Sequence, residues 1–204
     1  MLSVLAEQKM SGAGKIEGEA AVPPQKKEIA LPEKEKNHVT AIAAAPPPPP
    51  VLSVTQATHV DIPDICGLYK KVWDEFRGKV PQELEKTWQP SPLEFTSMME
   101  GMTYFAARKD RKLVGVVCCS MVDGAMYISH IAVDPDFRHQ GIGQALIGQC
   151  LEWAKRSNAA SGWIEAMSRF THAVSLFRKL GFKDTGVIHK HLWKEDVVLL
   201  EIVF

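Results

Sequence analysis

The sequence predicts one mixed α/β domain that follows a long N-terminal arm. Three observations predict this fold class: an ordinary globular composition, an alternation of strand-like and helix-like segments after residue 50, and a glycine turn joining a strand to a helix. The chain has 204 residues, 46% hydrophobic and 24% charged, which is enough for one well-buried core. Its 24 Lys and Arg residues balance 24 Asp and Glu residues, so the net charge gives no attraction to nucleic acid or an anionic membrane.

Residues 1–50 form the N-terminal arm, which is rich in Lys, Glu, Ala and Pro, contains no aromatic residue and ends in a proline run. A segment of this composition buries too little apolar surface to offset the conformational entropy it would lose on folding. The sequence therefore predicts a disordered arm with a polyproline linker over residues 1–50, and a folded domain over residues 51–204. The proline run leaves open that the arm docks onto a protein partner.

The four cysteines, Cys66, Cys118, Cys119 and Cys150, lack the C-x-x-C spacing of metal and redox sites. They are expected to be free thiols that are mostly buried, with no metal cofactor, in a reducing compartment. The N-terminus has no basic segment followed by a long apolar one, and no run reaches about 18 apolar residues. We therefore expect a cytoplasmic protein that does not enter membranes.

The predicted domain opens with a strand over residues 51–57 and an amphipathic helix over residues 61–76. The helix carries apolar side chains at helical spacing, and Asp61 is a suitable N-cap. Prolines then divide the chain into loops and a short helix over residues 93–100.

Three strand-like runs follow over residues 103–108, 113–121 and 126–133, and their short polar turns indicate an antiparallel meander. A helix over residues 143–155 then leads to a strand over residues 162–167. Strand, helix and strand of these lengths predict a right-handed parallel crossover.

The end of the chain predicts a last helix and a hairpin. Apolar residues between 173 and 180 recur at helical spacing, and Gly181 is a good residue to end that helix. Two closing strands, over residues 185–193 and 197–204, are joined by a turn at residues 194–196.

The glycine turn lies at residues 138–143, between the strand that ends at Val133 and the helix that follows. Such a turn presents unpaired backbone N–H groups along the positive end of the helix dipole, an arrangement that binds phosphate. Gly141 permits a positive φ or close approach of an anion, and Gly143 lets the first helical turn lie close to that anion. The turn lacks the Lys-Ser/Thr of a nucleotide-binding P-loop and the third glycine of a dinucleotide site.

The segment HIAVDPDFRHQGIGQALI resembles the acetyl-CoA-binding motif of the GNAT N-acetyltransferases, R/Q-x-x-G-x-G/A, with Arg138, Gly141 and Gly143 at its fixed positions. AVSLFRKLGF resembles the second signature of that family, and the first segment is most similar to the ribosomal-protein N-terminal acetyltransferases. The resemblance implies a GNAT fold over residues 51–204: a mixed, mostly antiparallel sheet, splayed at the acetyl-CoA site and flanked by helices. It implies transfer of an acetyl group from acetyl-CoA to a primary amine of a protein N-terminus, a lysine or a small molecule.

The resemblance also implies which residues hold acetyl-CoA. The main-chain groups of Ile131, Ala132 and Val133 would pair with the pantetheine amides. The other implied contacts surround the pyrophosphate: Arg138, His139, Gln140, Gly141, Ile142, Gly143 and Gln144.

Two residues are candidates for the proton transfers. Glu165 aligns with the glutamate that serves as base in the ribosomal-protein enzymes, although a glutamate on a strand can simply be solvated or paired. Tyr127 takes the position where histone-type members carry their glutamate, and packing is the alternative role for its ring. The histidines His130, His189 and His191 have suitable chemistry, but histidines on strands are more often structural.

Two residues depart from the family pattern. Phe177 stands where the family commonly has the tyrosine that protonates the departing thiolate, and Phe170 replaces an asparagine that often contacts the cofactor. The first departure raises a second hypothesis, a non-catalytic acyl-CoA sensor or assembly subunit with a GNAT fold.

Overall fold

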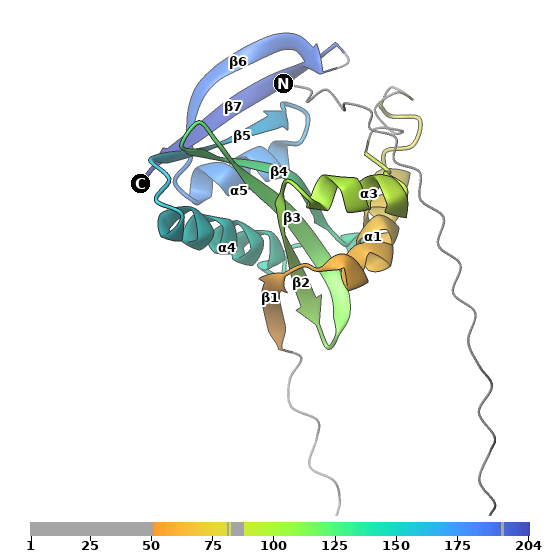
Figure 1. The fold of residues 1–204 in the computed structure, drawn as a ribbon. Helices are drawn as coiled ribbons and strands as arrows, with labels where there is room; N and C mark the ends of the chain where they lie inside the picture. The colour runs from red at the N-terminus through yellow and green to blue at the C-terminus, as the bar shows by residue number, and fades with distance from the viewer. Residues whose placement is uncertain (1–50, 81, 83–87, 193) are drawn as a thin grey trace, which may run out of the picture. The chain divides into compact units, whose positions relative to one another are not determined.

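The computed structural model describes residues 51–80, 82, 88–192 and 194–204, so the arm predicted over residues 1–50 lies outside the described residues. All of the described elements belong to one compact unit, Pro47–Phe204 (Figure 1). The elements are β1 (Leu52–Gln56), α1 (Ile62–Asp74), α3 (Pro92–Met99), β2 (Thr103–Lys109), β3 (Lys112–Val122), β4 (Ala125–Val133), α4 (Ile142–Arg156), β5 (Ser161–Met167), α5 (Thr171–Lys179), β6 (Lys183–Leu192) and β7 (Glu195–Val203), with short 3-10 turns at His59–Asp61 and Pro135–Phe137.

The strands form one seven-stranded sheet in the order β1-β2-β3-β4-β5-β7-β6. Strands β4 and β5 are parallel, joined by the α4 crossover, and the other neighbouring pairs are antiparallel. The predicted mixed, mostly antiparallel fold is therefore confirmed, and every predicted element is found within a few residues of its expected ends.

The parallel pair separates partway along its length. Strand β4 pairs with β5 from Ala125 opposite Ser161 to Ile128 opposite Ile164, and this ladder goes no further among the described residues. Beyond Ile128, β4 keeps its partners on β3 but has an open edge on the β5 side. This opening is the splay that the resemblance implies.

A β-bulge in β4 begins at the splay. Ala132 pairs with Val116 and Ser129 with Cys118, so two residues of β4 lie opposite one of β3. His130 has a positive φ of 49° in this bulge, and its carbonyl accepts a hydrogen bond of 2.7 Å from the hydroxyl of Tyr69 on α1. The bulge therefore depends on a long-range contact with α1.

Apolar side chains are buried on both faces of the sheet. One face packs against α4 and α5 through residues such as Leu146, Ile164 and Phe177, and the other packs against α1 and α3 through residues such as Ile65 and Phe95 (Figure 1). The neighbouring Cys118 and Cys119 fall in different clusters, as strand alternation requires, and all four cysteines are free. Among the described residues, no helix is both long and apolar enough to cross a membrane.

Two predicted helix ends can be compared with the structure. Asp61 does not cap α1 with its side chain; its carboxylate instead accepts the Thr58 N–H at 2.8 Å and pairs with Arg108. Asp61 therefore occupies the predicted N-cap position without the capping hydrogen bond, because the chain enters α1 through a 3-10 turn begun at Thr58. Gly181 ends α5 as predicted: it has a φ of 96°, and its N–H donates to the Arg178 carbonyl at 3.1 Å.

Candidate functional site

The N-terminus of α4 presents a row of unpaired backbone donors. Gly141 is the N-cap of this 15-residue helix, with a φ of 78°, and its carbonyl accepts the first helical hydrogen bond from Ala145 at 2.9 Å. In the part of the chain that the structure describes, nothing accepts a hydrogen bond from the N–H groups of residues 139–144. Six consecutive donors at the positive end of a helix dipole form a site suited to an anion.

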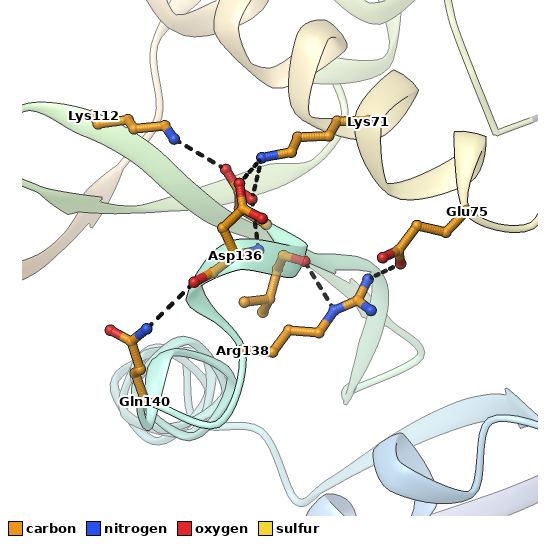
Figure 2. Close-up of polar contacts among 8 residues, drawn as sticks. Lys71, Glu75, Lys112, Asp136, Arg138 and Gln140 are labelled. Carbon is orange, nitrogen blue, oxygen red and sulfur yellow. Dashed lines mark hydrogen bonds and ion pairs between the residues drawn. The ribbon is translucent and has the colours of Figure 1, made fainter.

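The turn that leads to these donors is fixed by a buried carboxylate. Asp134 is 2% exposed, and it receives Lys71 Nζ at 2.6 Å, Lys112 Nζ at 3.4 Å and the Asp136 N–H at 3.1 Å (Figure 2). Burial raises the pKa of Asp134, but the hydrogen bonds from Lys71, Asp136 and Lys112 outweigh it and leave the pKa below its usual value. The carboxylate thus stays charged and ties the turn to α1 and β3.

Two predicted cofactor contacts use their side chains within the protein. Arg138 Nη2 lies 2.7 Å from Glu75 Oε2, just beyond α1, and Arg138 Nε donates to the Val133 carbonyl at 3.4 Å (Figure 2). Gln140 accepts a hydrogen bond from Lys109 at 2.9 Å and reaches the Asp136 carbonyl at 3.5 Å. Both side chains therefore brace the turn, and its main-chain N–H groups remain available.

The two motif glycines serve different purposes in the fold. A Cβ on Gly141 would meet no atom within 4 Å, so it is the positive φ that favours glycine there. A Cβ on Gly143 would lie 3.0 Å from Leu176 Cδ2, so the absence of that atom lets α4 approach α5. The structure thus gives Gly143 a packing role between helices, and the expected approach of its main chain to an anion stays a prediction.

The open edge of β4 lies next to the helix N-terminus. Ala132 and Val133 pair with Val116 and Gly115 of β3, and Ile131 belongs to the bulge. The ladder with β5 has already ended at Ile128, so the other edge of residues 131–133 faces the splay. An extended ligand with amide groups could form main-chain hydrogen bonds there, in the manner of an added strand.

The two candidate proton-transfer residues lie close to each other. Tyr127 on β4 is in register with Trp163 on β5, and their rings stack with centroids 4.2 Å apart and planes at 29°. Glu165 lies two residues further along β5, on the same face as Trp163. Burial and then the charge of Glu165 raise the pKa of Tyr127 to about 12. The phenol is therefore protonated at neutral pH, close to a carboxylate.

Two of the three candidate histidines have structural contacts. His130 lies in the bulge, where its Nδ1 is 2.9 Å from the Ser129 hydroxyl, and burial lowers its pKa. His189 is exposed on β6 and pairs with Asp196 at 3.1 Å, and His191 is also exposed. No group of three or more His, Cys, Asp or Glu residues in the described ranges could hold a metal ion.

The two departures from the family pattern are placed differently. Phe177 is 1% exposed, and its ring packs edge-on against Phe182 in the core beneath the sheet. Phe170, at the N-cap of α5, turns its ring toward the end of α1 and meets Phe76 at a centroid distance of 5.2 Å.

Sequence reasoning missed two parts of this region: the Trp163 ring that stacks on Tyr127, and the Lys71–Asp134–Lys112 cluster that fixes the turn. Both depend on residues brought together from distant strands and helices, so no local pattern could have identified them. An aspartate directly after a strand was the one available signal for Asp134.

Comparison with known proteins defines the class. A model of the Acetyltransferase (GNAT) family matches residues 65–182, more than half of the chain. The protein therefore belongs to the GNAT acetyltransferase family, and the resemblance noted in the sequence is confirmed.

Individual relatives share less than a third of their residues with this chain over the matched region. Human N-acetyltransferase 8B is 29% identical over 110 residues, which are 51% of this chain and 48% of that protein, so the match spans about half of the relative. The [Ribosomal protein bS18]-alanine N-acetyltransferase of Escherichia coli K12 is 24% identical over 102 residues, 48% of this chain and 69% of that protein.

Solved structures agree with the fold. The PaiA N-acetyltransferase of Thermoplasma acidophilum in complex with coenzyme A has a TM-score of 0.63 at 14% identity, covering 76% of this chain and 99% of that one. The ribosomal-protein-S18-alanine N-acetyltransferase of Escherichia coli has a TM-score of 0.62 at 19% identity, covering 75% of this chain and 94% of that one. At these identities the likeness concerns the fold alone.

Proposed function

We propose that this protein is an acetyl-CoA-dependent N-acetyltransferase that acetylates a primary amine. The observation that carries the proposal is the row of six free N–H groups at the start of α4, next to the open edge of β4. A diphosphate needs several donors and a positive potential, and a pantetheine chain carries amides that pair with a strand edge. The residues present therefore fit both ends of coenzyme A.

In this proposal the main chain holds the co-substrate. The N–H groups of residues 139–144 bind the diphosphate, and the main-chain groups of Ile131, Ala132 and Val133 pair with pantetheine. Acetyl-CoA supplies the acyl group as a thioester, so that an amide C–N bond forms as the C–S bond breaks. Fixing two reactants in orientation contributes about 7–11 kcal/mol, which makes placement the largest part of catalysis.

Two side chains move the protons. Glu165 accepts a proton from the acceptor ammonium, directly or through water, since an amine of pKa about 8 to 10 is largely protonated at neutral pH. Tyr127, whose pKa is raised to about 12, holds a proton that it can donate to the departing sulfur. Tyr127 thereby takes over the role of the family's usual tyrosine, whose position is occupied by Phe177 in this protein.

Binding of acetyl-CoA tests the diphosphate site through an exposed residue of the first turn. Gln144→Glu places a negative charge among the donors, which favours the helix by about 0.3–1 kcal/mol through its dipole. The same charge repels the diphosphate, and unit charges 4 Å apart in water cost about 1 kcal/mol, or about fivefold in affinity.

Calorimetric titration should therefore show weaker binding of acetyl-CoA to a variant that is no less stable. Gln149→Glu, which adds the same charge further along α4, is the control and should bind nearly as the native protein does. Equal affinity in all three proteins would rule out the α4 N-terminus as the diphosphate site.

The alternative is a non-catalytic acyl-CoA sensor, favoured by the buried Phe177, whose ring has no proton to donate. A turnover assay separates this alternative from catalysis. Free thiol release should be followed with acetyl-CoA and a mixed pool of peptides and polyamines. Glu165→Gln should lower kcat by about 10²–10⁴-fold while acetyl-CoA still binds. Tight acetyl-CoA binding with no thiol release across the pool would favour the sensor.

A further inference from the structure

A half-buried group of aromatic side chains lies at the carboxyl end of β5. We call Trp73, Phe76, Trp88 and Phe170 the aromatic wall; all four are partly exposed. The Trp73 and Trp88 ring centroids are 4.2 Å apart, and Phe170 meets Phe76 at 5.2 Å and Trp73 at 6.3 Å. A contiguous apolar group that stays partly exposed can serve as a binding surface.

The aromatic wall adjoins Glu165 along β5. Side chains alternate along a strand, so Met167 points to the same face as Glu165, about 7 Å further on. Met167 is buried in one cluster with Val80 and Val197, and the rings of Phe76, Trp88 and Phe170 pack against that cluster. Leu199, which pairs with Glu165 across the sheet, packs there too. The surface running from Glu165 to the wall is therefore apolar.

Arg169 holds together the segments on either side of the wall. Its guanidinium donates to the Lys79 carbonyl at 2.7 Å and pairs with Glu195 Oε1 at 2.7 Å. The first contact fixes the chain after α1, and the second fixes the start of β7. The β5–α5 connection thus clamps two distant segments beside the wall.

Several charged side chains around the wall have partners within the protein. Glu75 pairs with Arg138 at 2.7 Å, and Arg77 pairs with Asp74. Asp196 is held by the Lys190 N–H at 2.9 Å and by His189. Arg169 and Glu195 satisfy each other. Among the described residues, the Glu165 side chain makes no ion pair or hydrogen bond, which leaves it available to an acceptor ammonium.

We propose that the acceptor is an α-amino group whose own side chain is large and apolar, such as a peptide that begins with Leu, Met or Phe. This inference rests on the proposed acetyltransferase function and specifies its substrate. The ammonium lies at Glu165, and the adjacent side chain packs on the aromatic wall. A polar or charged side chain there would lose its hydration without gaining a partner.

The test compares acceptors that differ in one residue. Peptides identical except for an N-terminal Phe, Leu, Ala or Ser are acetylated by the full chain, beside an N-blocked peptide with one lysine and a polyamine. Phe-terminal and Leu-terminal peptides should exceed the Ser-terminal peptide by about tenfold or more in kcat/KM, the usual discrimination of an apolar site.

Two variants of the wall and one control locate the effect. Phe170→Asn, which restores the residue of the family pattern, and Trp88→Ala should each reduce the preference for Phe over Ser by about tenfold. Trp153→Ala removes another half-buried tryptophan, on α4, and should leave the preference unchanged. Circular dichroism confirms that each variant is folded, and calorimetry measures binding of the Phe-terminal peptide in the presence of CoA.

The outcomes separate this inference from the proposed function. A preference for the Ser-terminal peptide, the lysine or the polyamine would overturn the inference while the enzyme remained an acetyltransferase. A preference for apolar termini that survives in both wall variants would overturn the role of the wall. If acetyl-CoA binds but no amine is acetylated and no peptide binds, the proposed function and the inference both fail.

Discussion

The hydroxyl of Tyr69 is predicted to stabilise the β4 bulge and, through it, the open edge of the splay. Tyr69 is 4% exposed, and its hydroxyl donates a 2.7 Å hydrogen bond to the carbonyl of His130, the bulge residue with a positive φ. Tyr69→Phe keeps the ring and removes this donor, so the main change is an unpaired carbonyl. Leaving a buried polar group unpaired costs about 1–3 kcal/mol.

Thermal and urea unfolding followed by circular dichroism measure this cost. For a domain of this size, 1 kcal/mol lowers Tm by about 2–4 °C, so Tyr69→Phe should lower Tm by about 2–12 °C. The matched control is Tyr104→Phe, because Tyr104 is equally buried at 1% exposed. Its hydroxyl faces sulfur, with Met102 Sδ at 4.0 Å and Cys118 nearby, and sulfur is a weak acceptor. That control should lose about 1 kcal/mol or less.

The loss of this hydrogen bond should also affect the binding of CoA. If the bulge orients residues 131–133, calorimetric titration of Tyr69→Phe with CoA should also show weaker binding at a temperature where the variant is fully folded. The reasoning is refuted if Tyr69→Phe is as stable as the native protein, or if Tyr104→Phe costs as much.

Three further predictions concern the turn and the clamp. The pKa of Asp134 is lowered in the folded state, so its contribution to stability is present above the unfolded pKa of about 3.9 and is lost as the pH falls through the folded pKa. Asp134→Asn should therefore lower the free energy of unfolding in urea at pH 7 by about 1–3 kcal/mol and flatten its dependence on pH below pH ~4. An unchanged pH dependence below pH ~4 would contradict this. Gly141→Ala should destabilise the domain by about 1–2 kcal/mol because of its positive φ, whereas Gly148→Ala, within α4, should stabilise it by about 0.5–1 kcal/mol. If denaturant unfolding showed that both substitutions stabilise, or that both destabilise, the backbone conformations at these two glycines would not explain the result. Arg169→Met should speed amide hydrogen exchange near Lys79 and Glu195 together, whereas faster exchange in one segment alone would mean that the two are not coupled by the clamp.

Much of the fold could be predicted because its signals are local. The amphipathic helices, the short turns of the meander and the glycine after α5 are each encoded within a few residues. The crossover from β4 to β5 followed from the strand, helix and strand lengths and a handedness rule. Asp61 takes its predicted place at the N-cap of α1, but the contacts of its carboxylate could not be predicted, because they involve Arg108 on the distant strand β2.

The candidate site could be predicted only in its main-chain part. The free N–H groups at α4 follow from one segment, from His139 to Gln144. The side-chain environment does not: Arg138 belongs to the motif, yet its guanidinium is bound to Glu75, 63 residues earlier in the chain. Likewise the contact of Tyr127 with Trp163 depends on the register between two strands, and nothing in either strand alone fixes that register.

The end of α1 explains why the departure at Phe170 is compatible with the site. Arg138, after β4, pairs with Glu75, and Phe170, after β5, packs on Phe76, so adjacent residues at the end of α1 contact the connections that follow both splayed strands. An asparagine at position 170 would leave the second contact without its ring. The aromatic side chain thus replaces the polar group of the family pattern with a hydrophobic link between α1 and the β5–α5 connection. In our proposal, that link also completes the aromatic wall beside Glu165, the residue assigned to the acceptor ammonium.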